Sequence, residues 1–494
     1  MKLAALAAGV TGAQVRAGGE SEIQRVVQDS RQAGPGDLFV AIPGERVDGH
    51  GFAAEVAARG AAVALEREVP LPAGTPMLLV PAGRRALGEL AAELFGRPAR
   101  RLRVAGVTGT DGKTTTTHLT HHLLNSAGLK AGALSTIALQ TATATRANES
   151  GLTTLDAIEV QRFLAELLAA GCRYAVVEAT SHALVQERVS ACDFDVAVFT
   201  NVGRDHLDYH ASWDEYLEAK ARLITLCANA PAKGISKAVL LNADDASFPR
   251  LVTRPIERRL IYSLERDADL RALDLRPSER GSRFTLELEG RRFAAELPMQ
   301  GRFNVANALA AAGACLALGA DAEQIASGLA TFAGIPGRLE RVDAGQPFEV
   351  YIDFAHAAGA LASALGELRR RTRGRLIAVF GSTGRSDHDR PGMGRAAAEG
   401  ADFFLITSDD PVNEDPAAIA SQVEAGVIGR RRGSDYDIEL DRREAIRRAV
   451  AMARPGDVVL LAGKGHERFM YLATGKVPWN EREVALAAIR DVSR

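Results

Sequence analysis

The chain has 494 residues, with 60 lysine and arginine residues against 62 aspartate and glutamate residues and a formal net charge of -2. This near-neutral balance argues against a protein that binds nucleic acids or membrane surfaces through a basic excess. The hydrophobic content of 47% and the charged content of 25% are ordinary for a soluble globular protein, and the length predicts about three domains.

The compartment can be inferred from the cysteines and from the apolar segments. The four cysteines are scattered without a C-x-x-C pair, which indicates neither a disulfide framework nor a zinc site and fits a reducing compartment. The first residues, MKLAALAAGV, precede no clean cleavage site and predict an amphipathic segment, not a signal peptide. The longest apolar stretch, residues 308–318, is far shorter than the roughly 20 residues that span a bilayer. We therefore expect a cytoplasmic protein that neither enters a membrane nor binds nucleic acid.

Three regions follow one another along the chain. Residues 1–100 combine a short strand pattern at residues 37–42 with alanine-rich helical stretches, and they end in a linker at residues 97–101. Next come short apolar strands that each end in a polar, glycine-bearing motif, at residues 104–107, 174–177, 196–199 and 238–241. After a second linker at residues 333–337 the pattern restarts, with strands expected at residues 350–352, 376–380, 403–406 and 458–461. This alternation predicts an α/β fold with mainly parallel sheets and ligands at the carboxyl ends of the strands.

The motif GVTGTDGKTT at residues 106–115 lies between an expected strand and an expected helix. Its glycines let backbone N–H groups face an anion, and the helix N-terminus adds a favourable partial charge. Lys113 would then reach the β- and γ-phosphates of a nucleotide, and the hydroxyl of Thr114 or Thr115 would hold Mg²⁺. The spacing departs from G-x-x-x-x-G-K-[ST], because position 107 is valine. A glycine-rich turn without a ligand is the alternative.

Four further motifs of the middle region each allow two interpretations. Glu178, at the end of an expected strand, is either structural or a carboxylate that completes a Mg²⁺ site. The segment TNVGRDHLDYH at residues 200–210 either ligates metal and orients ligands or caps a loop. From its spacing alone, Lys220 is either a helix-surface lysine paired with a nearby glutamate or a lysine with a functional role. Asn304 and Asn307 lie three residues apart on one helix face, where they either cap the helix or read an adenine edge.

In the last third, polar motifs again follow the expected strands: DFAH at residues 353–356, GSTGR at 381–385, SDDPV at 408–412 and GKGHE at 463–467. Because the carboxyl ends of parallel strands meet at one edge of a sheet, four such motifs predict one shared site.

These residues resemble the Mur ligase family of cytoplasmic peptidoglycan synthesis over the whole chain, and in particular its members that add the third residue of the stem peptide. The family's own phosphate loop, GTxGKT, accounts for the unusual spacing. The resemblance implies an N-terminal UDP-MurNAc-binding domain at residues 1–100, a central P-loop-type ATPase domain with a parallel sheet at 101–336 and a C-terminal Rossmann-like, amino-acid-binding domain at 337–494. It also implies a monomer with a role in cell wall biogenesis, cell shape and cell division.

The resemblance also implies roles for individual residues. The substrate UDP-N-acetylmuramoyl-L-alanyl-D-glutamate would be held by Ser30, Thr153, Thr154, Ser181 and Arg188. ATP would be held by Gly109, Thr110, Gly112, Lys113, Thr114, Thr115, Asn304, Arg338, Asp353 and His356. The catalytic set would be Lys113, Glu178, His206 and Lys220. Two Mg²⁺ ions are implied, one held with the help of Thr114 and Glu178, the other attended by His206 and by Lys220 as a carbamate. The family usually has proline or glycine after the two threonines, and Leu155 departs from this pattern.

The reaction of the family explains why the site needs positively charged side chains and a lysine. The D-glutamate carboxylate attacks the γ-phosphate of ATP to give an acyl phosphate and ADP, and the amine of the incoming amino acid then displaces phosphate. A carboxylate and a triphosphate repel each other, so the site must supply positive charge. A carbamate forms from CO₂ and a neutral amine, which a buried lysine can offer and an arginine cannot.

The amino acid added is inferred from the motif at residues 409–412 and from the acidic residues near it. Family members that add meso-diaminopimelate typically read D-N-P-R where this chain reads D-D-P-V at residues 409–412, and Val412 cannot pair with a distal carboxylate as arginine does. Asp409, Asp410 and Glu467, beside Gly463, would form an acidic pocket that favours a terminal ammonium, with Arg385 left to bind the α-carboxylate. We therefore expect L-lysine or L-ornithine, with meso-diaminopimelate as the alternative. No residue distinguishes lysine from ornithine.

Three other functions compete with this assignment. A folylpolyglutamate synthetase is disfavoured by the N-terminal region and by the GKGHE motif. A GTPase-like switch would carry an N-K-x-D motif, which the sequence lacks. A regulatory UDP-sugar-binding protein without catalysis is disfavoured by the joint presence of Lys113, Glu178 and Lys220.

Overall fold

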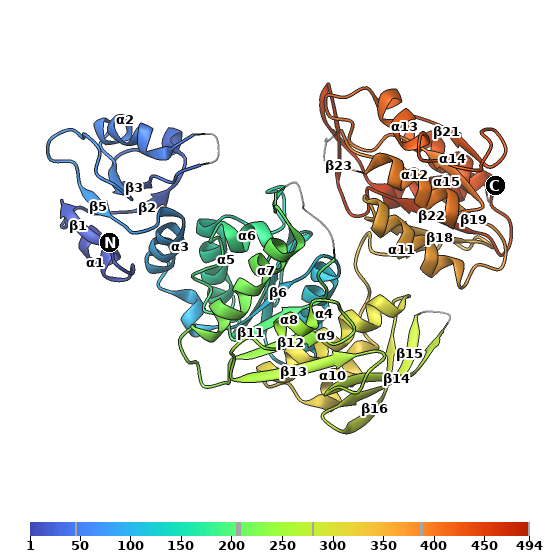
Figure 1. Cartoon of the computed structure of the whole chain (residues 1–494), viewed down its shortest axis with the longest axis horizontal. Coiled ribbons are helices and arrows are strands. Elements are labelled where there is room, and N and C mark those ends of the chain that lie inside the picture. The colour runs from blue at the N-terminus through green and yellow to red at the C-terminus, as the bar shows by residue number, and fades with distance from the viewer. Residues whose placement is uncertain (45–46, 204–208, 279–280, 385–388, 493–494) are drawn as a thin grey trace. The chain divides into compact units, whose positions relative to one another are not determined.

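The computed structural model describes residues 1–44, 47–203, 209–278, 281–384 and 389–492. The chain divides into two compact units, one formed mainly by residues before 333 and one mainly by residues 333–494. Three α/β domains are present, as the sequence predicts, each with its own sheet (Figure 1). The exact domain boundaries stay predictions.

The N-terminal domain is a five-stranded sheet in the order β1-β5-β4-β3-β2, with all neighbours parallel except β1 and β5. Helices α1 and α3 pack a core on one face, and α2 packs a second core on the other. Burial on both faces explains why β3 and β4 are apolar at almost every position. The elements are α1 (Leu3–Ala8), β1 (Gln14–Ala17), β2 (Arg25–Val27), η1 (Ser30–Gln32), β3 (Asp37–Val40), η2 (Gly49–Phe52), α2 (Ala53–Ala58), β4 (Ala62–Leu65), β5 (Met77–Leu79), α3 (Gly83–Leu94) and η3 (Pro98–Arg101).

The central domain is built on an eleven-stranded sheet in the order β16-β15-β14-β13-β12-β11-β6-β10-β7-β8-β9. Its elements are β6 (Arg103–Thr108), α4 (Lys113–Ser126), β7 (Ala131–Leu134), β8 (Ala138–Gln140), β9 (Thr145–Ala147), α5 (Ala157–Ala169), β10 (Tyr174–Glu178), α6 (Ser181–Val185), β11 (Val196–Phe199), α7 (Trp213–Ala228), β12 (Ala238–Asn242), α8 (Phe248–Leu251), β13 (Arg258–Ser263), β14 (Leu270–Pro277), β15 (Ser282–Leu288), β16 (Arg291–Leu297), α9 (Arg302–Leu318) and α10 (Ala322–Leu329). The four strands expected in this region are present within one residue of their predicted bounds.

The middle of this sheet is parallel and covered by helices on both faces. Helices α5, α6 and α7 share one core with alternate strand residues, including Val239 and Leu241 of β12. Helix α9 lies on the other face, because Gly313 faces Leu240, which points away from its two neighbours on the strand. Strands β14 to β16 extend the sheet as an antiparallel meander that the sequence analysis did not predict.

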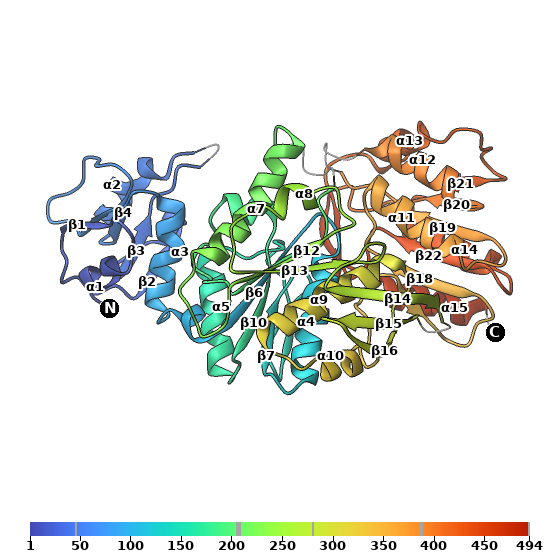
Figure 2. The same ribbon diagram turned by 60° about the horizontal axis from the view of Figure 1, so that its bottom comes forward.

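The C-terminal domain has a six-stranded sheet in the order β17-β18-β22-β19-β20-β21, in which only β17 runs antiparallel to its neighbour. Helices α11, α12 and α13 pack one face, and α14 and α15 pack the other (Figure 2). The elements are β17 (Glu340–Val342), β18 (Glu349–Asp353), α11 (Ala358–Arg369), β19 (Leu376–Phe380), α12 (Arg390–Gly400), β20 (Phe403–Ile406), α13 (Pro416–Glu424), β21 (Tyr436–Ile438), α14 (Arg442–Met452), β22 (Val458–Ala462), the hairpin β23 (Phe469–Leu472) and β24 (Gly475–Pro478), and α15 (Glu481–Val492). Among the described residues, no helix is long and apolar enough to cross a membrane.

Candidate active site

The phosphate loop joins β6 to α4, as its glycines predict. Gly109 has a φ of 154°, and a Cβ on it would lie 1.8 Å from the Thr200 hydroxyl oxygen. Gly112 has a φ of 80°, and a Cβ there would lie 2.2 Å from Oδ1 of Asn307. Neither position accepts a side chain, so the close backbone packing that shapes the loop depends on both glycines.

The segment that follows β11 forms hydrogen bonds with this loop. The Asp111 N–H donates to Oδ1 of Asn201 at 2.9 Å, and the Thr200 hydroxyl donates to the Asp111 carbonyl at 2.6 Å. The Thr110 N–H donates to the Asn201 carbonyl at 2.9 Å. The start of the segment at residues 200–210 therefore orients the phosphate loop. His206 lies outside the described residues, so its expected metal role stays a prediction.

Lys113 and Lys220 converge on the loop from two helices. Nζ of Lys113, the first residue of α4, donates to the carbonyls of Gly109 at 3.0 Å and Thr110 at 2.7 Å. Nζ of Lys220 on α7 donates to the same Gly109 carbonyl at 2.7 Å and lies 4.3 Å from the Tyr216 ring centroid. Lys220 is only 1% exposed, so the surface position suggested by its spacing is wrong. Both ammonium groups therefore place positive charge at the same point of the loop, the Gly109 carbonyl.

Glu178 ends β10 beside the phosphate loop and is buried. Its Oε1 accepts from the hydroxyls of Thr114 at 2.9 Å and Thr136 at 3.1 Å, and its Oε2 accepts from the Thr136 N–H at 2.8 Å. A carboxylate and two hydroxyls are the hard oxygen ligands that Mg²⁺ prefers, so this donor set fits the ion. Thr115, the next residue of α4, is also buried.

Three of the residues expected to hold the muramoyl substrate lie near the carboxyl end of β10. The Thr154 hydroxyl donates to the Glu178 carbonyl at 2.8 Å, and Arg188 donates to the Thr154 carbonyl at 3.1 Å. Ser181 begins α6 there, with a buried hydroxyl that has no hydrogen-bond partner among the described residues. Thr153 adjoins them in sequence and is partly buried.

Two expected ligand residues lie elsewhere in the first unit. Ser30 begins η1 of the N-terminal domain, where Asp29 caps the turn by accepting from the Arg31 N–H at 3.0 Å. Asn304 is buried on α9, and its Oδ1 lies 3.4 Å from the amide nitrogen of Asn307. Asn307 is the residue that touches Gly112, so this pair adjoins the phosphate loop from the first turns of α9.

The three ATP-site residues expected in the C-terminal domain gather around Phe354. Asp353 ends β18 and accepts from the N–H groups of Leu339 at 2.7 Å and Ala355 at 2.8 Å. The Arg338 guanidinium lies 4.8 Å from the Phe354 ring centroid, and the His356 ring lies 4.5 Å from it. Burial raises the pKa of the Asp353 carboxyl, although Arg338 opposes this effect.

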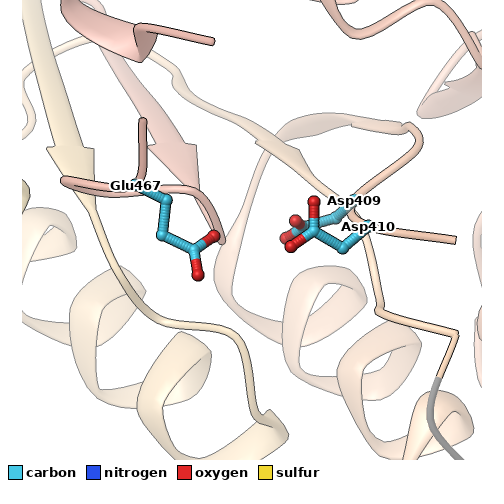
Figure 3. A group of neighbouring side chains, drawn as sticks. All are labelled: Asp409, Asp410 and Glu467. Carbon is cyan, nitrogen blue, oxygen red and sulfur yellow. The ribbon is translucent and has the colours of Figure 1, made fainter. Parts of the chain in front are cut away.

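The polar motifs of the last third follow β18, β22, β19 and β20, which are consecutive and parallel in the sheet. The prediction that they share one sheet edge is confirmed for the described residues. Asp409, Asp410 and Glu467 bring carboxylate oxygens within 4.8 Å of one another (Figure 3). Gly463 has a φ of 110°, and a Cβ there would lie 2.1 Å from Oδ2 of Asp409. Arg385 lies outside the described residues.

The expected acidic pocket also contains a buried lysine, which the sequence analysis did not place among the acids. Nζ of Lys464 lies 2.6 Å from Oε2 of Glu467, 2.8 Å from Oδ1 of Asp410 and 3.9 Å from Oδ1 of Asp409. Asp410 and Glu467 are therefore paired with the lysine, and a metal ion bound between the three acids would have to displace it. Burial alone would lower the pKa of Lys464, but the charges of Asp409, Glu467 and Asp410 outweigh it and raise that pKa.

Three residues of these sites were not predicted from the sequence: Thr136, Arg442 and Glu481. Thr136 precedes β8, and only the pairing of β7 with β10 brings it to Glu178. Arg442 and Glu481 form a buried ion pair behind Gly463, with Nη2 to Oε1 at 2.5 Å. No motif marks these residues, because long-range contacts place them.

Three family models match most of the chain. They are described as "Mur ligase family, catalytic domain" (residues 22–94), "Mur ligase middle domain" (residues 107–315) and "Mur ligase, glutamate ligase domain" (residues 337–465). The chain is also 42% identical to a UDP-N-acetylmuramyl-tripeptide synthetase of Roseiflexus sp. (strain RS-1), over 95% of each chain. The chain belongs to the Mur ligase family.

Two further members of the Mur ligase family bear on the amino acid. A UDP-N-acetylmuramoyl-L-alanyl-D-glutamate–2,6-diaminopimelate ligase of Gloeobacter violaceus is 42% identical over 97% of this chain and 96% of its own. A solved structure of a ligase with the same name is 31% identical, covers 100% of this chain and 99% of its own, and has a TM-score of 0.71. The names of these relatives specify 2,6-diaminopimelate. They therefore support the alternative amino acid, meso-diaminopimelate, over the lysine or ornithine expected from the sequence.

Proposed function

We propose that this Mur ligase is a UDP-N-acetylmuramoyl-tripeptide synthetase that joins meso-diaminopimelate to UDP-N-acetylmuramoyl-L-alanyl-D-glutamate at the expense of ATP. The enzyme class rests on the full-length similarity to tripeptide synthetases. The observation that carries the chemistry is the convergence of Lys113, Thr114, Glu178 and Lys220 on one phosphate loop.

The geometry suggests how the chain handles the first step, in which the D-glutamate carboxylate attacks the γ-phosphate. The glycines of the loop and the N-terminus of α4 present N–H groups to the phosphates. Nζ of Lys113 would leave the carbonyls of Gly109 and Thr110 and donate to phosphate oxygens instead. Its positive charge would then offset the repulsion between the D-glutamate carboxylate and the triphosphate. Thr114 and Glu178 would hold a Mg²⁺ ion, which neutralises charge on the phosphates when bound.

The second step needs a neutral amine on the incoming amino acid and a place for its charged groups. The sheet edge that carries Asp409, Gly463 and Glu467 supports the amino-acid site. Oδ2 of Asp409 is buried without a hydrogen-bond partner among the described residues, so it is available to a substrate ammonium. Burial also raises the pKa of Asp409, and Arg442 opposes that rise.

L-Lysine or L-ornithine is the second candidate, and one residue favours it. Val412 stands where meso-diaminopimelate-adding members of the family typically have arginine, and it has no group that could bind the distal carboxylate. The similarity to 2,6-diaminopimelate ligases outweighs this single position, because it extends over the whole chain.

An amino-acid panel tests the proposal. Purified enzyme is given ATP, Mg²⁺ and UDP-N-acetylmuramoyl-L-alanyl-D-glutamate, and phosphate release is measured with meso-diaminopimelate, L-lysine and L-ornithine, with product mass as a second readout. We expect release to require both the nucleotide-sugar substrate and an amino acid, with the highest kcat/KM for meso-diaminopimelate. Release without the nucleotide-sugar substrate would contradict the ligase, and faster turnover of lysine or ornithine would reverse the choice of amino acid.

A further inference from the structure

Lys464 is a charged side chain that the proposed reaction does not yet use. It follows β22 in the sheet and is 0% exposed, although it carries an ammonium group. A buried ammonium is costly unless it is paired and hydrogen-bonded. Lys464 meets this condition with two acids from different parts of the chain, Asp410 at 2.8 Å and Glu467 at 2.6 Å.

The partner Asp410 has a second contact, which ties the ion pair to the local backbone. Its Oδ1 accepts from Nζ of Lys464 and also from the Tyr471 N–H, at 2.9 Å. The Val412 N–H donates to the Tyr471 carbonyl at 2.9 Å, so the 408–412 loop and β23 are joined twice. Asp410 is therefore a fixed internal counterion, not a free pocket carboxylate.

Asp409 differs from Asp410 in its contacts. Its Oδ1 lies 3.9 Å from Nζ of Lys464, beyond hydrogen-bond distance, and its Oδ2 is buried without a hydrogen-bond partner among the described residues. Figure 3 shows Asp409 and Asp410 side by side, with Glu467 facing them. The single positive charge of Lys464 thus offsets one of the three negative charges, and Asp409 is the carboxylate that Lys464 contacts least.

Resting on the proposed function, we propose that Lys464 is a positioning residue that sets the charge of the amino-acid pocket by offsetting one of the three negative charges of Asp409, Asp410 and Glu467. A pocket with Lys464 in place tolerates the distal carboxylate of diaminopimelate. The same pocket without it carries one more uncompensated negative charge and favours a side chain that ends in an ammonium alone.

The test measures a selectivity ratio, kcat/KM for meso-diaminopimelate divided by kcat/KM for L-lysine, from amino-acid-dependent phosphate release. Lys464→Met removes the ammonium at similar volume and should lower this ratio at least about 10-fold. Asp410→Asn removes one negative charge and should raise the ratio. The double variant Lys464→Met with Asp410→Asn restores the balance, and its ratio should return close to that of the wild type.

A matched control separates selectivity from stability. Lys237 is a comparably buried lysine of the central domain that pairs with Asp195 at 2.9 Å, and Lys237→Met should leave the ratio unchanged. If Lys464→Met does not fold, the comparison of Asp410→Asn with the double variant gives the same readout, because the two differ only at position 464.

Each outcome then supports or overturns the proposal. Equal losses with both amino acids in every variant would show that Lys464 is merely structural and would overturn it. A wild-type enzyme that turns over neither amino acid with UDP-N-acetylmuramoyl-L-alanyl-D-glutamate would overturn the proposed function, and this proposal with it. An active wild type with an unchanged ratio across the variants would overturn the role of Lys464 alone.

Discussion

Lys113 and Lys220 lie on different helices, yet their ammonium groups donate to the same acceptor, the Gly109 carbonyl oxygen, at 3.0 and 2.7 Å. A carbonyl dipole lets two like charges approach one another that would otherwise repel. Phosphate oxygens are charged acceptors and form stronger hydrogen bonds than a carbonyl does. We therefore expect both cations to exchange this carbonyl for phosphate oxygens when a nucleotide binds.

Lys113→Met tests the role of the first lysine. The substitution removes the one formal positive charge that the first turn of α4 brings to the γ-phosphate, so kcat/KM for ATP should fall on the order of 100-fold or more. Phosphate release with both other substrates saturating is the measurement. Lys130→Met, at an exposed lysine of the same domain, is the control and should keep wild-type activity. Activity of Lys113→Met within a few-fold of the wild type would contradict the assignment.

Lys220→Arg asks whether a carbamate is needed. A carbamate nitrogen keeps one N–H, which can still donate to Gly109, while its carboxylate offers new oxygen ligands. Arginine keeps a donor and a charge but cannot react with CO₂. We expect wild-type activity to fall when CO₂ and bicarbonate are removed and to recover when they are restored. Lys220→Arg should be inactive at every bicarbonate concentration, and an active, bicarbonate-independent variant would rule out the carbamate.

Glu178→Gln tests the Mg²⁺ site. The substitution removes the negative charge and places an amide N–H₂ where Oε1 or Oε2 accepts hydrogen bonds from Thr114 and Thr136. The Mg²⁺ concentration that gives half-maximal activity should rise at least about 10-fold. Thermal unfolding without Mg²⁺ shows whether the variant is folded. A misfolded variant would lose activity at every Mg²⁺ concentration, whereas a folded variant with a weakened metal site would recover activity at high Mg²⁺. An unchanged Mg²⁺ dependence would remove Glu178 from the metal site.

The acid stability of the central domain should depend on His121. Burial, with a smaller contribution from neighbouring His122, lowers the pKa of His121 to about 4, from about 6.5 for an exposed histidine. The unfolded chain therefore binds a proton more readily than the folded one between these values. The resulting stability is complete above about pH 6.5 and is lost as the pH falls towards 4, by up to about 3 kcal/mol.

His121→Gln isolates that contribution, because glutamine does not titrate. Urea unfolding at pH 7 and at pH 5 gives the free energy of unfolding of both proteins. The wild type should lose more stability than the variant on going from pH 7 to pH 5. An equal loss in the two proteins would mean that His121 does not carry the pH dependence.

The parallel strands and the phosphate loop could be predicted from the sequence, because each depends on residues that are close together in the chain. Apolar runs gave the parallel strands, and the glycines at positions 109 and 112 gave the phosphate loop, because only glycine fits those backbone positions. The meander β14 to β16 was missed, although β15 alternates buried and exposed residues with the period of a strand. This alternation is the sequence signal from which the meander can be predicted.

Other features could not be read from local patterns. Lys220 looked like a surface residue, since the spacing of its neighbours does not reveal that α7 turns it towards Gly109, 111 residues away. The sequence placed Lys464 beside an acidic pocket, whereas its contact with Asp410, 54 residues away, shows that it offsets part of the negative charge of that pocket. Electrostatic character depends on which charges the fold brings together, and here it changed the interpretation of the substrate.

Val412→Arg is the substitution that distinguishes the two candidate amino acids. Val412 has a φ of 56°, a left-handed conformation that is strained for a β-branched residue. An arginine at this position would offer a planar pair of N–H donors to the distal carboxylate of meso-diaminopimelate. Its kcat/KM for meso-diaminopimelate relative to L-lysine should rise about 10-fold or more if position 412 faces the substrate.

Val412→Asn is the matched control for this change. Asparagine tolerates the left-handed conformation, so it relieves the same strain without adding a guanidinium. We expect it to stabilise the C-terminal domain by about 1 kcal/mol in thermal unfolding and to leave the selectivity ratio near that of the wild type. If Val412→Arg and Val412→Asn shift the ratio equally, backbone relief explains the effect. If neither shifts it, the distal carboxylate is bound elsewhere, and the absence of arginine at position 412 ceases to favour lysine or ornithine.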